Sequence, residues 1–340
     1  MLALSSFALV VGCGGEDAAA GGGSGGGGSG GGGSGGASAG GAAGAAGAGA
    51  GGAAGAAAGG AGGAGGAGGS SCGASALGAG DHVVELQHGG ATRSYRLHVP
   101  PSFDGTRALP MVLNFHGHDS NAFQQELFSA MDATADAGGF AVAYPEGLGA
   151  SWNAGVCCEP SNQTGVDDVG FVRAVIGDVA SKLCIDRARV YATGMSNGGF
   201  LSHRLGCEAA DVIAAIAPVD GVLGLPDAQC QPSRPMPIVH FYGTTDPLVP
   251  YALAAPANAT WIAKNACADP APTLTAQAGA SRCETWSQCQ AGVEVTLCTL
   301  EGMGHCWPGQ TFCPPGLGQA STDLAANDVM WSFFSRFTLP

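Results

Sequence analysis

The stretch that decides the fold lies near the middle of the chain and runs Val190-Tyr191-Ala192-Thr193-Gly194-Met195-Ser196-Asn197-Gly198-Gly199-Phe200-Leu201. Its first residues are apolar and rich in β-forming side chains, whereas the residues after the paired glycines continue with the apolar spacing of a helix. We therefore expect a strand, a sharp turn and a helix. The turn carries Ser196 in the pattern Gly-x-Ser-x-Gly, and its tightness would lift the Ser196 hydroxyl above the edge of a sheet.

The pattern alone is weak evidence because the chain is so rich in glycine. Glycine accounts for 61 of 340 residues, and the same pattern recurs around Ser24, Ser29 and Ser34. Those serines lie in a glycine run without a strand before it or a helix after it, so nothing could hold a strained turn there. Context therefore selects Ser196. A strand, turn and helix around such a serine form the nucleophile elbow of an α/β-hydrolase, where the amide of Asn197 would point at a developing oxyanion.

The first thirteen residues predict export. Residues 1–12 form an apolar segment too short to cross a bilayer, and Cys13 follows a small residue. This arrangement resembles a bacterial lipoprotein signal over residues 1–13, in which an acylated Cys13 would anchor the protein at the cell surface or outer membrane. An ordinary secretory signal, or a start placed too late, is the alternative, because the usual basic residues are missing. Both kinds of signal direct export.

A low-complexity segment follows. Residues 14–71 are almost entirely glycine, alanine and serine, with Glu16 and Asp17 as their only charges. Without aromatic or β-branched side chains the segment cannot bury enough apolar surface to offset the entropy of ordering, so we expect a flexible linker. Its end-to-end distance would be on the order of 40 Å. Residues 72–340 are enough for a single catalytic domain with a sizeable core.

Charge and cysteine content narrow the class of protein. A formal net charge of −14, with only 12 lysine and arginine residues and no basic cluster, disfavours nucleic acid as a partner. Apart from Cys13 the chain has twelve cysteines, and an even number in an exported chain indicates disulfides rather than metal ligands. Adjacent Cys157 and Cys158 are expected to bond to two different partners because a ring between neighbours is strained. Short spacings favour two local pairs, Cys289 with Cys298 and Cys306 with Cys313.

The order of elements predicts the rest of the fold. Strand and helix patterns alternate from residue 110 onward, after an opening hairpin joined through Gly89 and Gly90. This alternation predicts an α/β fold with a mostly parallel sheet, helices on both faces and an antiparallel N-terminal hairpin. In addition to the strand that leads to Ser196, the expected strands are 82–86, 93–99, 110–115, 140–144, 212–218, 237–242 and 293–300. The expected helices include 121–137, 167–183 and 325–337.

The catalytic groups are assigned by their order along the chain. In an α/β-hydrolase the serine is followed by an acid and then by a histidine, and only His305 lies beyond every candidate acid. Asp246 follows a predicted strand at the carboxyl edge of the sheet, where it would hold the imidazole tautomer and stabilise the imidazolium. Asp220, after the preceding strand, is the alternative acid. We expect His305 to take the Ser196 proton and an acyl-enzyme to form.

The place of each residue relative to the predicted strands and helices indicates which groups donate to the oxyanion and which polar side chains are structural. His116 and Gly117 end an inner strand, and Gly117 would let the backbone approach substrate closely. We assign the oxyanion to the amides of Asn197 and of His118, or a neighbour in that turn, at roughly 3 kcal/mol each. The His116 side chain is expected to be structural. The same role is expected of four further residues, namely His203, His240 and the helix-start acids Asp167 and Asp168.

Seven short motifs lie in order along the predicted folded part. They are Asn114-Phe-His-Gly117, Tyr144-Pro-Glu-Gly147, Ser151-Trp-Asn-Ala-Gly155, Asp167-Asp-Val-Gly-Phe171, Gly194-Met-Ser-Asn-Gly-Gly199, Tyr242-Gly-Thr-Thr-Asp246 and Gly304-His-Cys-Trp-Pro-Gly309. Together they resemble the secreted polyhydroxybutyrate depolymerase, feruloyl esterase and acetylxylan esterase family of α/β-hydrolases. The resemblance implies an exported serine esterase acting on polymer-linked esters, with Ser196, Asp246 and His305 as the triad. It also implies that Trp152 and Trp307 line the substrate surface or fill the core.

The function expected from these observations is hydrolysis of feruloyl or acetyl esters of plant cell-wall polysaccharide. A polyester depolymerase is the alternative among enzymes, and a catalytically silent surface lipoprotein that binds polymer is the alternative from another class. The expected partners are a small or polymeric ester and, through Cys13, a membrane. We expect a monomer that uses no metal ion and no cofactor.

Overall fold

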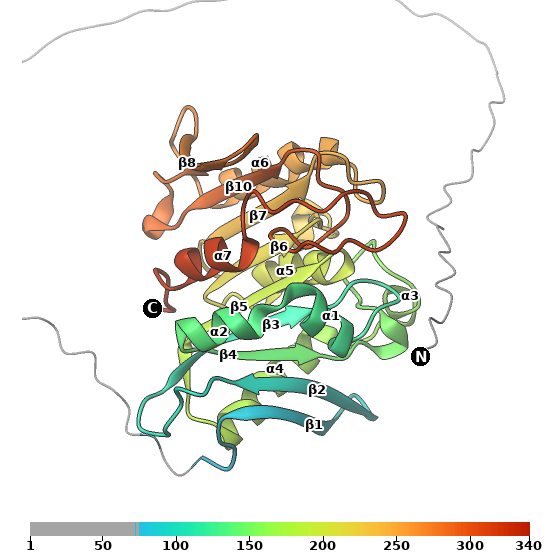
Figure 1. Cartoon of the computed structure of the whole chain (residues 1–340), viewed down its shortest axis with the longest axis vertical. Coiled ribbons are helices and arrows are strands. Elements are labelled where there is room, and N and C mark those ends of the chain that lie inside the picture. Colours follow the sequence, from blue (N-terminus) through green and yellow to red (C-terminus); the bar gives the residue numbers. More distant parts are fainter. Residues whose placement is uncertain (1–71, 73–74) are drawn as a thin grey trace, which may run out of the picture. The chain divides into compact units, whose positions relative to one another are not determined.

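The computed structural model describes residue 72 and residues 75–340 (Figure 1). Cys13 and the linker predicted at 14–71 lie outside the described residues. One ten-stranded sheet runs through the described part, in the order β1-β2-β4-β3-β5-β6-β7-β10-β9-β8. The strands are β1 (Gly80–His88), β2 (Ala91–Val99), β3 (Leu109–Phe115), β4 (Ala141–Pro145), β5 (Ile185–Met195), β6 (Ala215–Val219), β7 (Ile238–Gly243), β8 (Thr273–Ala278), β9 (Ser281–Trp286) and β10 (Val295–Leu300).

The centre of the sheet is parallel and both of its ends are antiparallel. Strands β4, β3, β5, β6, β7 and β10 pair in parallel, as their continuous apolar sequences predict, and each of them except part of β5 is buried. At one end β1 pairs with β2, which alternates buried and half-buried residues, and this confirms the N-terminal hairpin. At the other end the antiparallel pair β8 and β9 extends the sheet beyond β10, which the sequence had not indicated.

Helices cover both faces of the sheet, as expected (Figure 1). One face packs in a core cluster with side chains of α4 (Asp168–Lys182), α5 (Asn197–Glu208) and α6 (Ala254–Lys264). The opposite face packs with α1 (Ala122–Ser129), α2 (Met131–Gly138) and α7 (Ala326–Phe334). A short helix, α3 (Ser161–Thr164), lies in the loop between β4 and α4. The α/β-hydrolase architecture predicted from the sequence is therefore confirmed.

One expected helix is in fact two. The side chain of Asn121 accepts a hydrogen bond from the Gln124 amide and caps α1, as predicted. Ala130, however, has a left-handed backbone with φ of 47°, which ends α1 and turns the chain into α2. Alanine gives no local sign of such a break, so the apolar spacing across 121–137 could not reveal it. The sequence pattern around Trp261 does not predict a helix, and the structure places α6 there.

All twelve cysteines in the described part form disulfides. Cys306 bonds to Cys313 as predicted, but Cys289 bonds to Cys267 instead of Cys298, which corrects the first of the two local pairs. Cys157 and Cys158 bond to each other, which corrects the expectation of two separate partners. The ten other cysteines of the described part pair among themselves, so no other cysteine remains to bond with Cys157 or Cys158. The complete set is Cys72–Cys184, Cys157–Cys158, Cys207–Cys230, Cys267–Cys289, Cys283–Cys298 and Cys306–Cys313.

These disulfides bear on where the protein folds. Six bonds of this kind form and persist in an oxidising compartment, so the chain is an exported protein. Among the helices of the described residues, none combines the length and the apolar character that crossing a bilayer requires.

Candidate active site

Ser196 stands in a sharp turn between β5 and α5. Its φ of 55° and ψ of −122° lie outside the regions that L-residues favour, which is the strain expected of a nucleophile elbow. The Ser196 amide donates to the Val219 carbonyl at 2.9 Å, and its own carbonyl accepts from the Phe200 amide. Ser196 is partly exposed, whereas every other residue from Tyr191 to Phe200 is buried. The hydroxyl is therefore the accessible group of this segment.

The glycines around Ser196 are required by the backbone of the neighbouring strands. A Cβ on Gly194 would lie 2.6 Å from the Phe115 carbonyl oxygen, and one on Gly198 would lie 2.2 Å from the same atom. A Cβ on Gly199 would lie 2.7 Å from the Val219 carbonyl oxygen. Because strands on both sides approach this closely, no side chain fits at these positions, and the Gly-x-Ser-x-Gly-Gly pattern has a steric basis here.

An acid and an imidazole meet at the same edge of the sheet. His305 Nδ1 lies 2.6 Å from Asp246 Oδ2, and both side chains are buried. The other oxygen, Asp246 Oδ1, accepts the amides of Leu248 at 2.7 Å and Val249 at 2.9 Å. With both oxygens hydrogen-bonded, the Asp246 carboxylate is fixed in orientation. It holds the imidazole through Nδ1, so that Nε2 remains available to accept a proton.

The loop that carries His305 is held by its own backbone. The His305 amide donates to the Leu317 carbonyl at 2.6 Å, and the Gly304 amide donates to the Gln319 carbonyl at 2.9 Å. The Cys306–Cys313 disulfide closes the intervening loop directly after the histidine. A Cβ on Gly304 would lie 2.1 Å from the Leu317 carbonyl oxygen, so glycine is required where the two segments cross.

Ser196, Asp246 and His305 follow β5, β7 and β10, which belong to one parallel set. The carboxyl ends of parallel strands meet at one edge of the sheet, so the three predicted groups lie along the same edge. The Asp246–His305 contact is part of this geometry, and the transfer of the Ser196 proton to His305 stays a prediction. Asp220, the alternative acid, follows β6 between them and makes no hydrogen bond to His305 in the described part of the chain.

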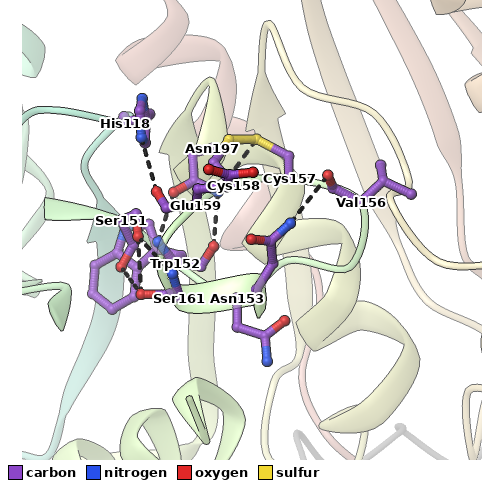
Figure 2. Close-up of a disulfide and its surroundings, with 12 residues drawn as sticks. His118, Ser151, Trp152, Asn153, Val156, Cys157, Cys158, Glu159, Ser161 and Asn197 are labelled. Atoms are coloured by element: carbon purple, nitrogen blue, oxygen red, sulfur yellow. Dashed lines mark hydrogen bonds between the residues drawn. A yellow bond between two sulfur atoms is a disulfide. The ribbon is translucent and has the colours of Figure 1, made fainter. Parts of the chain in front are cut away.

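The predicted oxyanion turn lies close to the serine. A Cβ on Gly117 would be 3.4 Å from Ser196 Cβ and 4.0 Å from Ser196 Oγ, so the backbone of this turn packs against the elbow. The Asn197 side chain is buried and bonds to the backbone of Trp152 in both directions, at 2.7 Å and 3.0 Å. His118 Nε2 lies 2.9 Å from the Glu159 carbonyl oxygen (Figure 2). The amides of Asn197 and His118 stay predicted donors.

The Cys157–Cys158 disulfide lies beside these two turns. Figure 2 shows it next to Asn197, whose Nδ2 is 3.6 Å from Cys157 Sγ. The Cys158 amide donates to the Trp152 carbonyl, the same oxygen that accepts Asn197 Nδ2. One loop therefore contacts both turns in which oxyanion donors are predicted.

The two tryptophans proposed for the substrate surface lie in the core. Trp152 is 0% exposed and donates from Nε1 to the His116 carbonyl at 2.9 Å. Trp307 is 1% exposed and donates from Nε1 to Asn327 Oδ1 at 2.9 Å. This corrects the expectation that either indole lines the surface and supports the other expectation, that they fill the core. Their ring nitrogens find partners inside the protein, which exposure at a surface would not require.

The three histidines expected to be structural, His116, His203 and His240, are buried, as predicted. Burial lowers the pKa of His116 to about 4, and its Nε2 accepts the Gly147 amide at 3.0 Å. Burial lowers the pKa of His203 to about 3, and its Nδ1 accepts from Trp261 Nε1. His240 is buried within β7, and burial lowers its pKa well below the usual range. At neutral pH all three rings are neutral, so none carries charge into the site.

Asp168 is more than an ordinary acid at a helix start. Asp167 caps α4 by accepting the Gly170 amide, as an acid in that position should. Asp168, however, is fully buried, with Oδ1 2.9 Å from Arg93 and Oδ2 accepting the Asn153 amide at 2.8 Å. This buried ion pair joins β2 to the start of α4, and the Asn153 amide adds the loop that follows β4. Two consecutive acids at the start of an otherwise apolar helix were the sequence signal that could have revealed this ion pair.

Within the part of the chain that the structure describes, two groups of side chains could hold a cation. Asp81, His98 and Asp132 form a partly exposed group in which His98 already bonds to Asp81. The second group is Asp220, Asp246 and His305, where Asp246 and His305 already bond to each other. The second group is a hydrogen-bonded acid and imidazole on the same sheet edge as an accessible hydroxyl, and these are the groups that nucleophilic attack on a carbonyl carbon uses.

Comparison with known proteins agrees with this geometry. Residues 93–248 match the family model described as "Esterase PHB depolymerase". The chain is 34% identical to "Feruloyl esterase B" of Piromyces equi over 71% of its own length, a match that spans 44% of the Piromyces protein. It is also 34% identical to "Putative esterase NocK" of Nocardia uniformis subsp. tsuyamanensis, covering 73% of this chain and 81% of the relative.

Among solved structures, the acetyl xylan esterase from Aspergillus awamori superposes with a TM-score of 0.56. That similarity covers 75% of this chain and 99% of the other, at 13% sequence identity, and it supports the fold alone.

Proposed function

Because this chain belongs to the esterase PHB depolymerase family, we propose that it is an exported carboxylic ester hydrolase that cleaves feruloyl or acetyl esters of plant polysaccharide. The observation that carries the proposal is an accessible serine in a strained elbow, on the same sheet edge as a buried imidazole 2.6 Å from a carboxylate. These are the parts that acyl transfer through a covalent intermediate needs.

In the proposed reaction His305 takes the proton of Ser196 Oγ as general base, and Oγ attacks the ester carbonyl carbon. The carbonyl oxygen becomes an oxyanion that accepts hydrogen bonds from the amides of Asn197 and His118. Asp246 stabilises the imidazolium that has formed. The imidazolium then gives its proton to the leaving alcohol, and an acyl-enzyme remains. Water, deprotonated by His305, attacks the acyl carbon and releases the acid, which restores Ser196.

The substrate class is inferred from the relatives. The names of the matched proteins include feruloyl esterases from several fungi and a bifunctional acetylxylan esterase/xylanase, which favours polysaccharide esters. The family description favours a second candidate, depolymerisation of a polyester such as polyhydroxybutyrate. Both candidates use the same attack on a carbonyl carbon, and they differ only in what the surface around the serine accepts.

A substrate panel tests the proposal. Purified protein is given methyl ferulate, acetylated xylan and polyhydroxybutyrate granules, with the Ser196→Ala variant as the control. We expect turnover of one or both polysaccharide-type esters and loss of that turnover in the variant. Activity confined to the granules would favour the polyester. Binding to a polymer without turnover of any ester would favour the catalytically silent surface protein and overturn the proposal.

Residues 1–13 support a further proposal about location, namely that Cys13 is acylated and anchors a monomeric enzyme to a membrane. Full-length protein made in a bacterial host and fed an alkyne-tagged fatty acid should carry the tag, and the Cys13→Ser variant should not. A tag present in both would refute acylation at this residue.

A further inference from the structure

Asp220 lies in the turn after β6, between the strands that carry Ser196 and Asp246, and no step of the proposed reaction uses it. Its side chain is fully buried, with 0% exposure. Its φ of 45° lies in the left-handed region, which residues other than glycine seldom adopt. A strained and buried ionisable side chain at the edge of an active site needs a physical reason.

The backbone around Asp220 is fixed on every side. The Asp220 amide donates to the Phe241 carbonyl at 2.9 Å. The next carbonyl, that of Gly221, accepts Tyr242 Oη at 2.5 Å and lies 3.2 Å from Nε2 of the neutral His203. A Cβ on Gly221 would lie within 2.8 Å of the backbone of Gly199 in the first turn of α5. This turn is therefore held rigidly against the nucleophile elbow.

The two carboxyl oxygens of Asp220 differ in their partners. Oδ1 accepts the Gly243 amide at 2.9 Å. Oδ2 is buried and has no hydrogen-bond donor among the described residues. One carboxyl oxygen of Asp220, one of Asp246 and one ring nitrogen of His305 all lie within 4.8 Å of one another. Two carboxyl groups thus share a buried space with a single imidazole, and two buried like charges at this separation are unfavourable.

The contacts decide which carboxyl group keeps the charge. Asp246 accepts two backbone amides and faces His305, so three groups stabilise its ionised form. Asp220 accepts the Gly243 amide, but burial together with the charge of Asp246 outweighs the amides of Gly243 and Cys306 and raises the pKa of Asp220 well above its usual range. Tyr242 and His203 also face this turn, and both are neutral, since burial raises the pKa of Tyr242 and lowers the pKa of His203.

We propose that Asp220 is a positioning residue, a neutral carboxylic acid whose Oδ2–H donates a hydrogen bond to the Asp246 carboxylate. Asp246 then lies between two donors, the acid of Asp220 and the imidazole of His305. This second hydrogen bond helps to fix the carboxylate and withdraws part of its charge. Less charge on Asp246 stabilises the imidazolium less, so His305 remains a free base at lower pH.

The inference rests on the proposed function, because it describes how the acid of that triad is held. Two substitutions test it through kcat/KM for p-nitrophenyl acetate between pH 4.5 and 9. The acidic limb of that profile reports the base of the free enzyme. Asp220→Asn keeps a neutral donor in place of the acid, so we expect activity within about threefold of wild type and an unmoved acidic limb. Asp220→Ala removes the donor, so we expect a fall of about tenfold and a limb shifted to higher pH.

The sign of the limb shift decides between the alternatives. If Asp220 were ionised, both substitutions would remove a negative charge near His305, and the limb would move to lower pH in both, which would overturn the proposal. It would also be overturned if Asp220→Asn lost as much activity as Asp246→Asn, since Asp220 would then be the triad acid. An Asp220→Ala profile identical to that of the wild type would reduce the residue to a structural role.

Two controls keep the outcomes separate. Thermal melts of each variant establish that it is folded, and if Asp220→Ala fails to fold, the limb of Asp220→Asn decides alone. Ser196→Ala is measured beside them. Full activity in Ser196→Ala would mean that the proposed function itself has failed, whereas its inactivity with a lowered limb in Asp220→Asn would refute only the role of Asp220.

Discussion

The substitution Gly198→Ala tests the steric argument for the elbow, because its cost can be worked out from the structure. The added Cβ would lie 2.2 Å from the Phe115 carbonyl oxygen, 2.6 Å from the Phe115 carbonyl carbon and 2.7 Å from the His116 carbonyl oxygen. All three are backbone atoms of β3 or of the turn after it, so no side chain can rotate away. Overpacking of a core typically costs 1–3 kcal/mol, and with rigid backbone on one side we expect about 3 kcal/mol of unfolding free energy to be lost.

Gly177→Ala is the matched control. Gly177 lies inside α4, and a Cβ there would have no heavy atom within 4 Å other than those of its chain neighbours and its own helix backbone. Replacing glycine by alanine in a helix interior stabilises by roughly 0.5–1 kcal/mol. The same chemical change is therefore expected to have opposite signs at the two positions. The difference comes from the surroundings of each glycine and not from the alanine methyl group itself.

The assay is thermal and urea unfolding of both variants, together with ester hydrolysis. For a domain of this size each kcal/mol shifts Tm by roughly 2–4 °C, so Gly198→Ala should melt about 6–12 °C below wild type and Gly177→Ala slightly above it. Displacing the turn by about 1 Å should also lower kcat on the order of 100-fold in Gly198→Ala. A Gly198→Ala protein as stable and as active as wild type would refute the steric account of the elbow.

Three further predictions concern the site. Asp246→Asn should lower kcat on the order of 10⁴-fold through loss of the correct imidazole tautomer, and steady-state kinetics showing a loss below tenfold would contradict this. Reductant, or the paired change Cys306→Ser with Cys313→Ser, should lower activity before the circular dichroism signal is lost, because that disulfide closes the loop after His305; activity retained until global unfolding would count against it. Burial raises the pKa of Asp220 in the folded protein, so ionisation of this carboxyl group favours the unfolded state. The resulting loss of unfolding free energy is absent below the unfolded-state pKa and grows as pH rises toward the folded-state pKa. Asp220→Asn should therefore gain stability over wild type by about 1.4 kcal/mol per pH unit in that window, and a difference in Tm that is constant from pH 4 to 7 would disprove it.

The sequence revealed the parts of the fold that local pattern controls. Apolar runs marked the parallel strands, and the glycines around Ser196 marked a turn because only glycine fits between β3 and β6. The meeting of Asp246 and His305 could be predicted because each follows a strand of one parallel set.

What the sequence left open depends on contacts between distant segments. Cys289 pairs with Cys267 across 22 residues and not with the nearer Cys298, because pairing follows the fold of the chain and not spacing alone. Trp152 is buried, and its indole donates to the His116 carbonyl in the turn directly after β3. The burial of Asp220 beside Asp246 is of the same kind, since two strands set side by side create it.

Covalent labelling tests the central claim, that Ser196 is the nucleophile activated by His305. Purified protein is treated with a fluorophosphonate probe, digested and mapped by mass spectrometry, with His305→Ala treated in the same way. The account predicts one adduct, on the peptide that contains Ser196, formed at a much lower rate in His305→Ala. An enzyme that hydrolyses esters while its adduct forms on another residue, or forms as fast without the imidazole, would contradict it.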